Sequence, residues 1–293
     1  MEFRGAFTAL VTPFMNGNFD EAAYRDLVEW QIESGIDGLV PCGTTGEAAT
    51  MTHAEQGEVI RVCVEQAKGR VPVIAGAGSN NTREAVELTR LAEQAGADAV
   101  LLISPYYNKP TPSGLVAHFK AVADETSVPI IIYNVPGRTG LNMQAPTVAR
   151  IAKEVPRVVG IKEATGDLKQ VSEVTEFCGK DFALLSGDDF TALPLLSVGG
   201  RGVISVVSNI VPDIVSHMCA AFAAGDATTA LDLHLRVSML SRAMFLETNP
   251  IPVKTALALM GRLPRAEFRL PLVPLESVNA DKLRAALSEA GLL

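Results

Sequence analysis

The side chain with the clearest capacity for covalent chemistry is Lys162, which follows the apolar residues Val158-Val159-Gly160-Ile161. A neutral lysine amine can attack a carbonyl carbon and form an imine, and apolar surroundings favour that neutral form. The ordinary alternative is a lysine at the edge of a strand that reaches into solvent. Successive side chains of a strand point to opposite faces, so Val159 and Ile161 are expected to share one face. If that face meets the helices of a barrel, Lys162 faces the interior.

A second side chain of interest, Tyr133, ends the apolar run Ile130-Ile131-Ile132. Neighbouring strands lie about 4.8 Å apart, so a tyrosine and a lysine that end adjacent strands could meet. The alternative is a strand-end aromatic ring that packs on the core with its hydroxyl in water. Together, Tyr133 and Lys162 therefore indicate a reactive site more strongly than either residue does alone.

Three loops carry further groups that could belong to a binding site. The segment Gly43-Thr44-Thr45-Gly46-Glu47 offers backbone N–H groups and hydroxyls that suit a carboxylate, although it would also suit a plain turn. Arg138 follows the strand that Tyr133 ends, and arginine binds carboxylates with a bidentate fork. Tyr106 and Tyr107 lie together in a loop, where two aromatic rings suggest an interface or a lid over a site.

Several other kinds of site are not expected. The four histidines have neither HxxH nor HExxH spacing, which argues against zinc, and no GxSxG motif indicates a serine hydrolase. Gly76-Ala77-Gly78 lacks the last glycine of a dinucleotide-binding loop. Gly199-Gly200 precedes the last strand, so a phosphorylated substrate is not expected either.

The elements that must position these groups form a regular series. Eight short apolar runs alternate with segments of helical spacing, and the runs cover residues 6–12, 38–43, 71–76, 99–105, 129–134, 158–163, 183–187 and 202–205. Continuous apolar strands are typical of a parallel sheet covered on both faces. Asp20 and Thr52-His53-Ala54-Glu55 are typical of helix starts. Eight such units predict a (β/α)8 TIM barrel, whose chemistry lies at the carboxyl ends of the strands.

The pattern changes near residue 224. Residues 227–246, 252–260 and 279–290 are predicted to be helices with no strand between them. The predicted organisation is therefore a barrel over residues 1–224, which carries the active site, and a C-terminal helical extension over residues 225–293.

Composition narrows the class of protein. The chain has 293 residues and a formal net charge of -8, with no basic stripe for nucleic acid and no polybasic segment for a membrane. Neither an apolar signal core nor an apolar run of about 20 residues is present. The four cysteines have no CxxC spacing and are expected to be reduced thiols. These features predict a cytoplasmic protein.

Three motifs together resemble one family. Gly43-Thr44-Thr45-Gly46-Glu47, Tyr133-Asn134-Val135-Pro136-Gly137-Arg138-Thr139 and Gly160-Ile161-Lys162-Glu163-Ala164 follow the order and spacing of the dihydrodipicolinate synthase and N-acetylneuraminate lyase family. The similarity covers essentially the whole chain. It is strongest to the members that condense pyruvate with L-aspartate 4-semialdehyde, because Arg138 stands where those members bind the carboxylate of the semialdehyde. Residues 249–254, NPIPVK, also resemble those members.

The resemblance implies no metal or organic cofactor, and it implies a role for each site residue. Lys162 would form the imine with pyruvate, Thr45 and Thr44 would hold the pyruvate carboxylate, and Tyr133 would move protons. Tyr107, from the neighbouring subunit of a tight dimer, would complete the relay with Thr44. Two dimers would form a homotetramer, and the product would enter the diaminopimelate route to lysine. The residues expected by position to line the pyruvate pocket are Gly187 and Ile204.

The resemblance also implies a site for L-lysine as feedback inhibitor at the dimer interface. The matching positions are Ala48, Ala49, His53, Gln56, Asn80, Glu84 and Tyr106. Gln56 departs from the histidine common in sensitive members, and Ala48 departs from a frequent serine. The prediction is weak or partial inhibition by lysine.

Two other functions stay open on the sequence alone. One is a pyruvate-dependent aldolase of the same family that cleaves a sugar acid, against which Arg138 argues. The other is a non-catalytic barrel that binds small acids. Trapping of pyruvate on Lys162 by borohydride would distinguish an enzyme that forms an imine with pyruvate from a barrel that only binds small acids.

Overall fold

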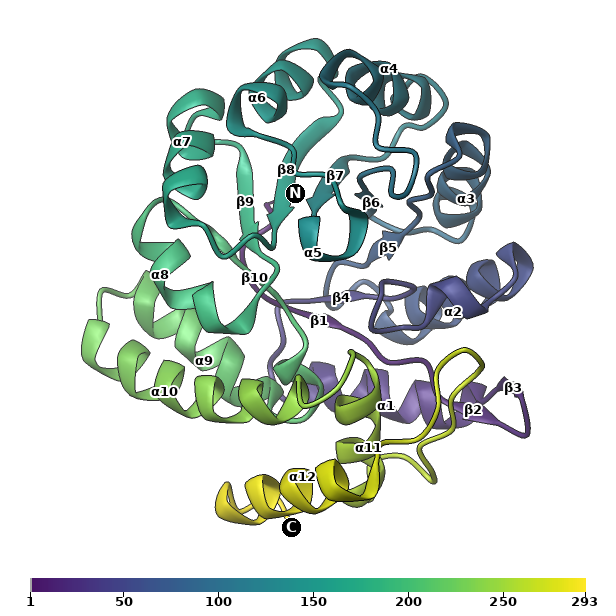
Figure 1. The fold of residues 1–293 in the computed structure, drawn as a ribbon, viewed down its shortest axis with the longest axis vertical. Coiled ribbons are helices and arrows are strands. Elements are labelled where there is room, and N and C mark those ends of the chain that lie inside the picture. The colour runs from purple at the N-terminus through teal and green to yellow at the C-terminus, as the bar shows by residue number, and fades with distance from the viewer. Residues whose placement is uncertain (1) are drawn as a thin grey trace.

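The computed structural model describes residues 2–293, and its centre is a sheet of eight parallel strands in the order β4-β1-β10-β9-β8-β7-β6-β5. The strands are β1 Gly5–Ala9, β4 Gly38–Val40, β5 Ile74–Gly76, β6 Ala99–Ile103, β7 Ile130–Asn134, β8 Val158–Glu163, β9 Ala183–Ser186 and β10 Gly202–Ser205. A parallel bridge between Leu39 and Val73 joins β4 to β5. The sheet therefore closes on itself (Figure 1), and the predicted (β/α)8 barrel is confirmed.

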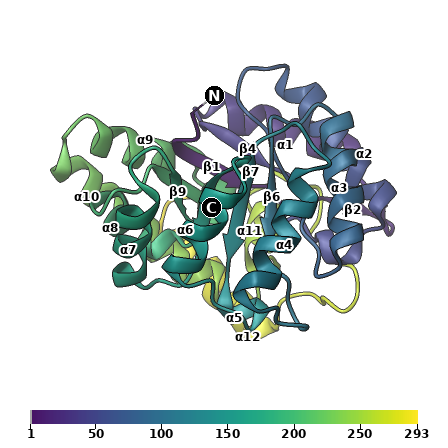
Figure 2. The ribbon, with the colours of Figure 1, turned by 90° about the horizontal axis from the view of Figure 1, so that it is seen from above.

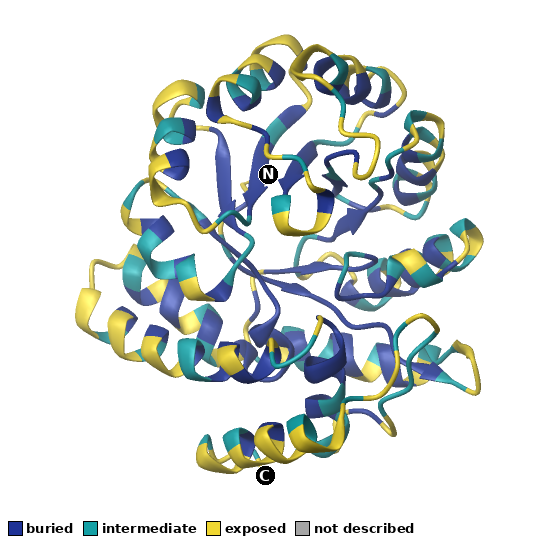
Figure 3. Ribbon diagram, viewed as in Figure 1, coloured by how far each residue is buried: buried dark blue, intermediate teal, exposed yellow. Residues whose placement is uncertain are grey.

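Helices surround the barrel and bury one side against it (Figure 3). Those that follow the strands are α1 Glu21–Glu33, α2 His53–Ala67, α3 Thr82–Gln94, α4 Pro112–Ala123, α5 Pro136–Thr139, α6 Ala145–Glu154, α7 Leu168–Cys178, α8 Ala192–Ser197 and α9 Pro212–Ala223. Short 3-10 turns precede three of them: η1 Ala48–Thr50, η2 Asp189–Thr191 and η3 Val207–Asn209. The predicted helix starts are confirmed. The Asp20 side chain accepts a hydrogen bond from the N–H of Ala23, and Thr52 forms a capping box with Glu55.

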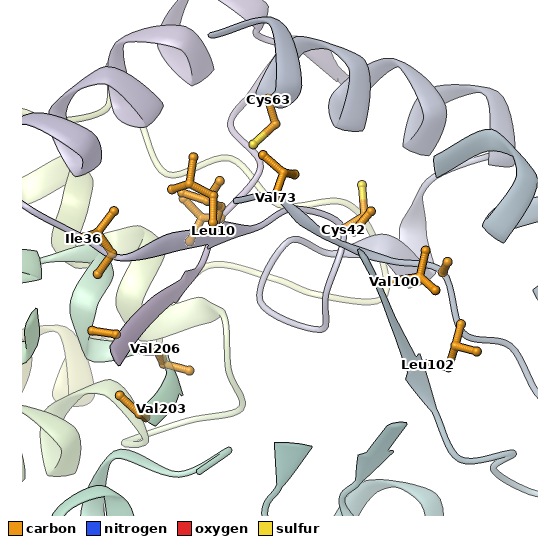
Figure 4. Packing of buried hydrophobic residues seen from close by; sticks show 14 of the residues in the cluster. Leu10, Ile36, Cys42, Cys63, Val73, Val100, Leu102, Val203 and Val206 are labelled. Carbon is orange, nitrogen blue, oxygen red and sulfur yellow. The ribbon is translucent and has the colours of Figure 1, made fainter. Parts of the chain in front are cut away.

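Two separate apolar cores result from the alternation of side chains along the strands. The inner core fills the barrel and includes Phe7, Ile131 and Leu185. The outer core lies between the strands and the helices, and Figure 4 shows part of it, with Leu10 and Val73 among its residues. A barrel filled in this way is solid below its mouth, so a ligand can enter only at the ends of the strands.

Strand β8 contains an irregularity that corrects one prediction. Ile130 pairs with Val158 while Ile131 pairs with Gly160, so Val159 is an extra residue in β8. Val159 packs with the inner core and Ile161 with the outer core, so the prediction that these two side chains share a face is wrong. Lys162 still points into the barrel, because Ile161 faces the helices and the alternation is regular after the extra residue.

The chain after α9 forms three further helices, α10 Ala227–Met244, α11 Ile251–Leu259 and α12 Ser277–Glu289, with no strand between them. Each lies within two residues of its predicted bounds. In Figure 1, α10 lies beside α9, and α11 lies between α10 and α12. Side chains just before and within α11 contact the turn after β4, since Asn249 donates to Thr45 and Lys254 to Glu47. Within residues 2–293, no helix combines the length and apolar character required to cross a membrane.

A two-stranded hairpin after β1 was not predicted. Strands β2 Phe14–Met15 and β3 Asn18–Phe19 pair through the turn at Asn16 and Gly17, which both have positive φ. An Asn-Gly pair is a strong hairpin signal, but the two strands have only two residues each.

Candidate active site

A cavity of about 420 Å³ opens at the carboxyl ends of the strands. Five of the predicted site residues line it: Thr44, Thr45, Tyr133, Arg138 and Lys162. They come from the loop after β4, from the ends of β7 and β8, and from the short helix α5. Figure 2 shows the barrel from the side, with the short helix α5 at this end of β7. The sequence motifs therefore converge on one cavity at the end of the barrel where chemistry is expected.

Lys162 is buried and lies within the barrel mouth, with only 6% of its surface exposed. Burial lowers the pKa of its ammonium group to about 8; the charge of Asp189 opposes this fall and the charge of Arg138 adds to it. A methyl group on Gly187 would lie 3.0 Å from Cε of Lys162, so glycine there leaves room for the lysine side chain. The amine is thus close to the pKa that a nucleophile needs near neutral pH.

Tyr133 is the register partner of Lys162 on the adjacent strand. Nζ of Lys162 lies 4.3 Å from the centre of its ring. Burial raises the pKa of the Tyr133 hydroxyl to about 12, although the charge of Arg138 and a hydrogen bond with Thr44 partly oppose the rise. At neutral pH the hydroxyl is therefore protonated, and its ring lies against the amine, so Tyr133 is a candidate to give a proton and take it back.

The turn 43–47 presents its two threonines to the cavity. The N–H groups of Gly46 and Glu47 donate within the turn, to the carbonyls of Gly43 and Thr44. No hydrogen bond from the N–H of Thr44 or Thr45 forms among residues 2–293. These donors and the threonine hydroxyls at the cavity wall suit a small carboxylate.

Arg138 lies in α5, above the mouth of the cavity, and is exposed. One of its guanidinium nitrogens donates to the carbonyl of Asn249 at 3.3 Å. The remaining donors are available to a second carboxylate, because a guanidinium carries five N–H groups. Its position is consistent with a residue that holds a substrate entering after the first has bound.

The sequence interpretation missed two residues of the site. Asn249, 6% exposed, donates from Nδ2 to Oγ1 of Thr45 at 2.9 Å and so fixes that hydroxyl from the C-terminal region. Asp189 is buried beside the cavity floor, where it accepts from the Ser205 hydroxyl and from the N–H groups of Val206 and Val207. Only the position of Asn249 in the NPIPVK motif could have indicated it, and no local signal marks Asp189.

Three predicted residues do not line this cavity. Tyr107 is 90% exposed, with φ of 71°, and lies outside the cavity of its own chain. Gly187 packs against the lysine side chain, and Ile204 is fully buried in the inner core. Gly187 therefore shapes the space around Lys162, whereas Ile204 forms part of the inner core of the barrel.

The residues predicted for lysine binding lie on the outer wall of the same cavity. Ala48, Ala49, His53, Gln56, Glu84 and Tyr106 line it. Asn80 is next to them, since its side chain donates to the carbonyl of Tyr106 at 3.1 Å. Glu84 is tied down by Ser79 and Asn81, which leaves a carboxylate at a fixed position in the wall.

No metal site accompanies this arrangement in the described part of the chain, where no three His, Cys, Asp or Glu residues are grouped to hold an ion. Cys42, Cys63, Cys178 and Cys219 are free thiols. Burial raises the pKa of the Cys178 thiol to about 11, so this cysteine is protonated at neutral pH.

The model of the dihydrodipicolinate synthetase family matches residues 2–290. The chain belongs to this family. It is 69% identical, over the full length of both chains, to the 4-hydroxy-tetrahydrodipicolinate synthase of Maridesulfovibrio salexigens. It is 66% identical to that of Nitratidesulfovibrio vulgaris, again over the whole of both chains.

Two solved structures show the same fold with ligands. The dihydrodipicolinate synthase of Acinetobacter baumannii, in complex with pyruvate, has a TM-score of 0.96 and 45% identity over 99% of both chains. The enzyme of Cyanidioschyzon merolae, with lysine bound, has a TM-score of 0.96 and 42% identity over 99% of both chains. Both ligands belong to the chemistry predicted from the motifs.

Proposed function

We propose that Lys162 carries the 4-hydroxy-tetrahydrodipicolinate synthase reaction, in which pyruvate condenses with L-aspartate 4-semialdehyde on the diaminopimelate route to lysine. The activity follows from the family and from relatives that share more than half of the sequence over their full length. The observation that carries the residue assignment is a buried lysine with a pKa of about 8 beside a protonated tyrosine.

The first step forms the imine. The neutral amine of Lys162 attacks the ketone carbon of pyruvate, and loss of water gives the protonated imine. Thr45, Thr44 and their free N–H groups hold the carboxylate, which places the ketone near the lysine. Tyr133 gives a proton to the departing oxygen and recovers one later, consistent with its position beside Nζ.

The second step forms the carbon–carbon bond. The imine loses a proton from its methyl carbon to give an enamine, which adds to the aldehyde carbon of the semialdehyde. Arg138 binds the carboxylate of this second substrate at the mouth of the cavity. The amine of the semialdehyde then attacks the imine carbon, which closes the ring and releases Lys162 in its amine form.

The exposed Tyr107 acts on the site of a neighbouring subunit in a homotetramer made of two dimers. Its exposure and position outside its own cavity support this assignment. Coexpression of a Tyr107→Phe chain with a Lys162→Ala chain tests it. A mixed dimer then has one site with both Lys162 and Tyr107, so the mixture is more active than either variant alone. If Tyr107 serves its own chain, mixing restores nothing.

L-Lysine is proposed as a weak or partial inhibitor that binds the outer wall of the cavity. Glu84 supplies a carboxylate for an ammonium group, and His53 and Tyr106 provide further contacts. The wall continues into the turn 43–47 through Ala48, so an occupant lies close to the threonines that hold pyruvate.

The proposed function is tested by assaying the purified chain with pyruvate and L-aspartate 4-semialdehyde, alongside a panel of sugar acids. Condensation of the first pair, lost in Lys162→Ala, supports the proposal. Cleavage of a sugar acid without semialdehyde condensation would instead indicate an aldolase of the same family. Absence of any pyruvate chemistry would indicate a barrel that only binds small acids.

A further inference from the structure

We infer that the buried ion pair between Glu47 and Lys254 is a positioning device that sets the conformation of the turn 43–47 and thereby the affinity for pyruvate. The inference rests on the proposed function, in which Thr44 and Thr45 hold the pyruvate carboxylate. Neither Glu47 nor Lys254 touches the reacting atoms in that scheme. Their effect would pass through the backbone of the turn.

The ion pair joins two parts of the chain that are 207 residues apart in sequence. Nζ of Lys254, in α11, donates to Oε1 of Glu47 at 2.6 Å, and both side chains are completely buried. The ammonium group also lies 4.2 Å from the ring centre of Phe14 and 5.3 Å from that of Phe268. A charge enclosed in this way is costly unless it has a partner, so each residue confines the other to one place.

Glu47 is also the residue that closes the turn. Its N–H donates to the carbonyl of Thr44 at 3.1 Å, and its φ of 56° lies in the left-handed region, which is unusual for a residue with a side chain. The other carboxylate oxygen accepts from the N–H of Arg269 at 3.4 Å. The side-chain contacts therefore hold a residue whose backbone conformation decides where Thr44 lies.

The same C-terminal segment reaches the site a second time. Asn249, just before α11, donates to the hydroxyl of Thr45, and its carbonyl accepts from Arg138. Lys254 anchors the helix that follows Asn249 to the turn that contains Thr45. The ion pair and the asparagine together hold the turn at two points, Glu47 and Thr45, against one rigid element.

Energetics make a purely stabilising role a poor explanation. Replacing a buried ion pair by apolar residues of similar volume is often neutral or stabilising, whereas removing one partner is strongly destabilising. A pair kept only for stability would therefore have an apolar equivalent with the same activity. A pair kept for position would not, because apolar side chains fill the space without fixing the turn.

The test compares the double variant Glu47→Leu/Lys254→Met with the wild-type enzyme. The expected result is a folded protein whose KM for pyruvate is raised at least about tenfold, as expected for the loss of one charged hydrogen bond that orders the carboxylate site. The acid limb of the pH profile, which the pKa of Lys162 sets, should stay in place, since Lys162 keeps its surroundings. Borohydride trapping on Lys162 should still occur at saturating pyruvate.

A control for the loss of an ion pair elsewhere in the fold is the double variant Glu29→Gln/Arg70→Met, whose two side chains are about one third exposed rather than buried. It removes another ion pair, with a 2.6 Å contact, that links α1 to the segment before β5 at the amino ends of the strands. Its kinetics should equal those of the wild type. Comparable loss of pyruvate affinity in this control would overturn the inference, because any lost ion pair would then have the same effect.

Two further outcomes decide the matter. A double variant at Glu47 and Lys254 that folds and keeps the wild-type KM for pyruvate overturns the inference. If that variant does not fold, the single variant Glu47→Asp tests the inference instead, since it keeps the charge but draws the carboxylate back from Lys254. A raised KM for pyruvate in Glu47→Asp supports the inference, and an unchanged KM overturns it. Failure of the wild type to trap pyruvate would instead contradict the proposed function.

Discussion

Nζ of Lys162 lies 4.3 Å from the centre of the Tyr133 ring, and the two residues are direct register partners on β8 and β7. The strands themselves thus fix the distance between a nucleophile and a proton carrier. Because both residues point into the barrel, burial acts on both, lowering the pKa of the amine and raising that of the phenol. One apolar environment therefore prepares both groups for their roles at neutral pH.

The pKa of Lys162 predicts the pH dependence of imine formation. The amine must be neutral to attack, so the rate at subsaturating pyruvate should rise about tenfold per pH unit below the pKa and level off above it. With a folded pKa of about 8, the bend should appear near pH 8. The rate of imine formation is measured at a series of pH values by adding borohydride at set times after pyruvate and counting the trapped adduct. A bend near the ordinary lysine pKa of about 10.4 would contradict the assigned environment.

Asp189 offers a directional control for the same measurement. Its charge raises the pKa of Lys162, opposing the effect of burial. Asp189→Asn should therefore move the bend to lower pH, and an upward movement would show that the carboxylate does not act on the amine.

Tyr133→Phe should lower kcat while leaving imine formation possible. The ring that packs beside Lys162 is kept and only the hydroxyl is lost, so the expected loss is that of a general acid–base group, about 10²–10⁴-fold. Steady-state kinetics measure kcat, and borohydride trapping reports the imine separately. A variant with wild-type kcat would remove Tyr133 from the proton path.

Arg138→Ala should affect the second substrate rather than the first. Loss of a charged bidentate contact of about 3 kcal/mol predicts about a 100-fold fall in kcat/KM for aspartate semialdehyde. Arg138→Lys keeps the positive charge but cannot form the two parallel hydrogen bonds of a guanidinium, so it should recover only part of the lost kcat/KM. Unchanged semialdehyde kinetics in the alanine variant would instead favour an aldolase that acts on a sugar acid.

Inhibition by L-lysine should be weak or partial in the wild-type enzyme. Gln56 lies in the wall where sensitive members of the family commonly have histidine, and its side chain donates to the carbonyl of Ala48 at 3.0 Å. Gln56→His should strengthen inhibition and Glu84→Gln should weaken it. Activity is measured against lysine concentration. Complete inhibition of the wild type at low micromolar lysine would contradict the prediction.

The fold was largely predictable because its signals are local. Each of the eight apolar runs became a strand, and Asp20 and Thr52 cap helices as their types suggest. The orientation of Val159 was not predictable, because an extra residue in β8 depends on its pairing with β7 rather than on the run itself. The hairpin after β1 was missed although Asn16-Gly17 is a turn signal.

The site was predictable where its residues lie at the ends of strands or in the loops that directly follow them. Lys162, Tyr133 and Thr44 are marked by their position after apolar runs, and the structure places all three on one cavity. Asn249 holds Thr45 across 204 residues of sequence, and Asp189, in η2, acts on Lys162 through its charge. Contacts between residues so far apart in the sequence arise when the C-terminal helices pack on the barrel. The local pattern of one sequence does not reveal this packing.

Trapping with pyruvate and borohydride, followed by mass spectrometry of the peptides, tests the assignment of Lys162 most directly. One reduced pyruvate adduct is expected for each chain, on the peptide that contains Lys162, and none is expected in Lys162→Ala. An adduct on another lysine, or full labelling of the alanine variant, would show that the nucleophile has been assigned wrongly.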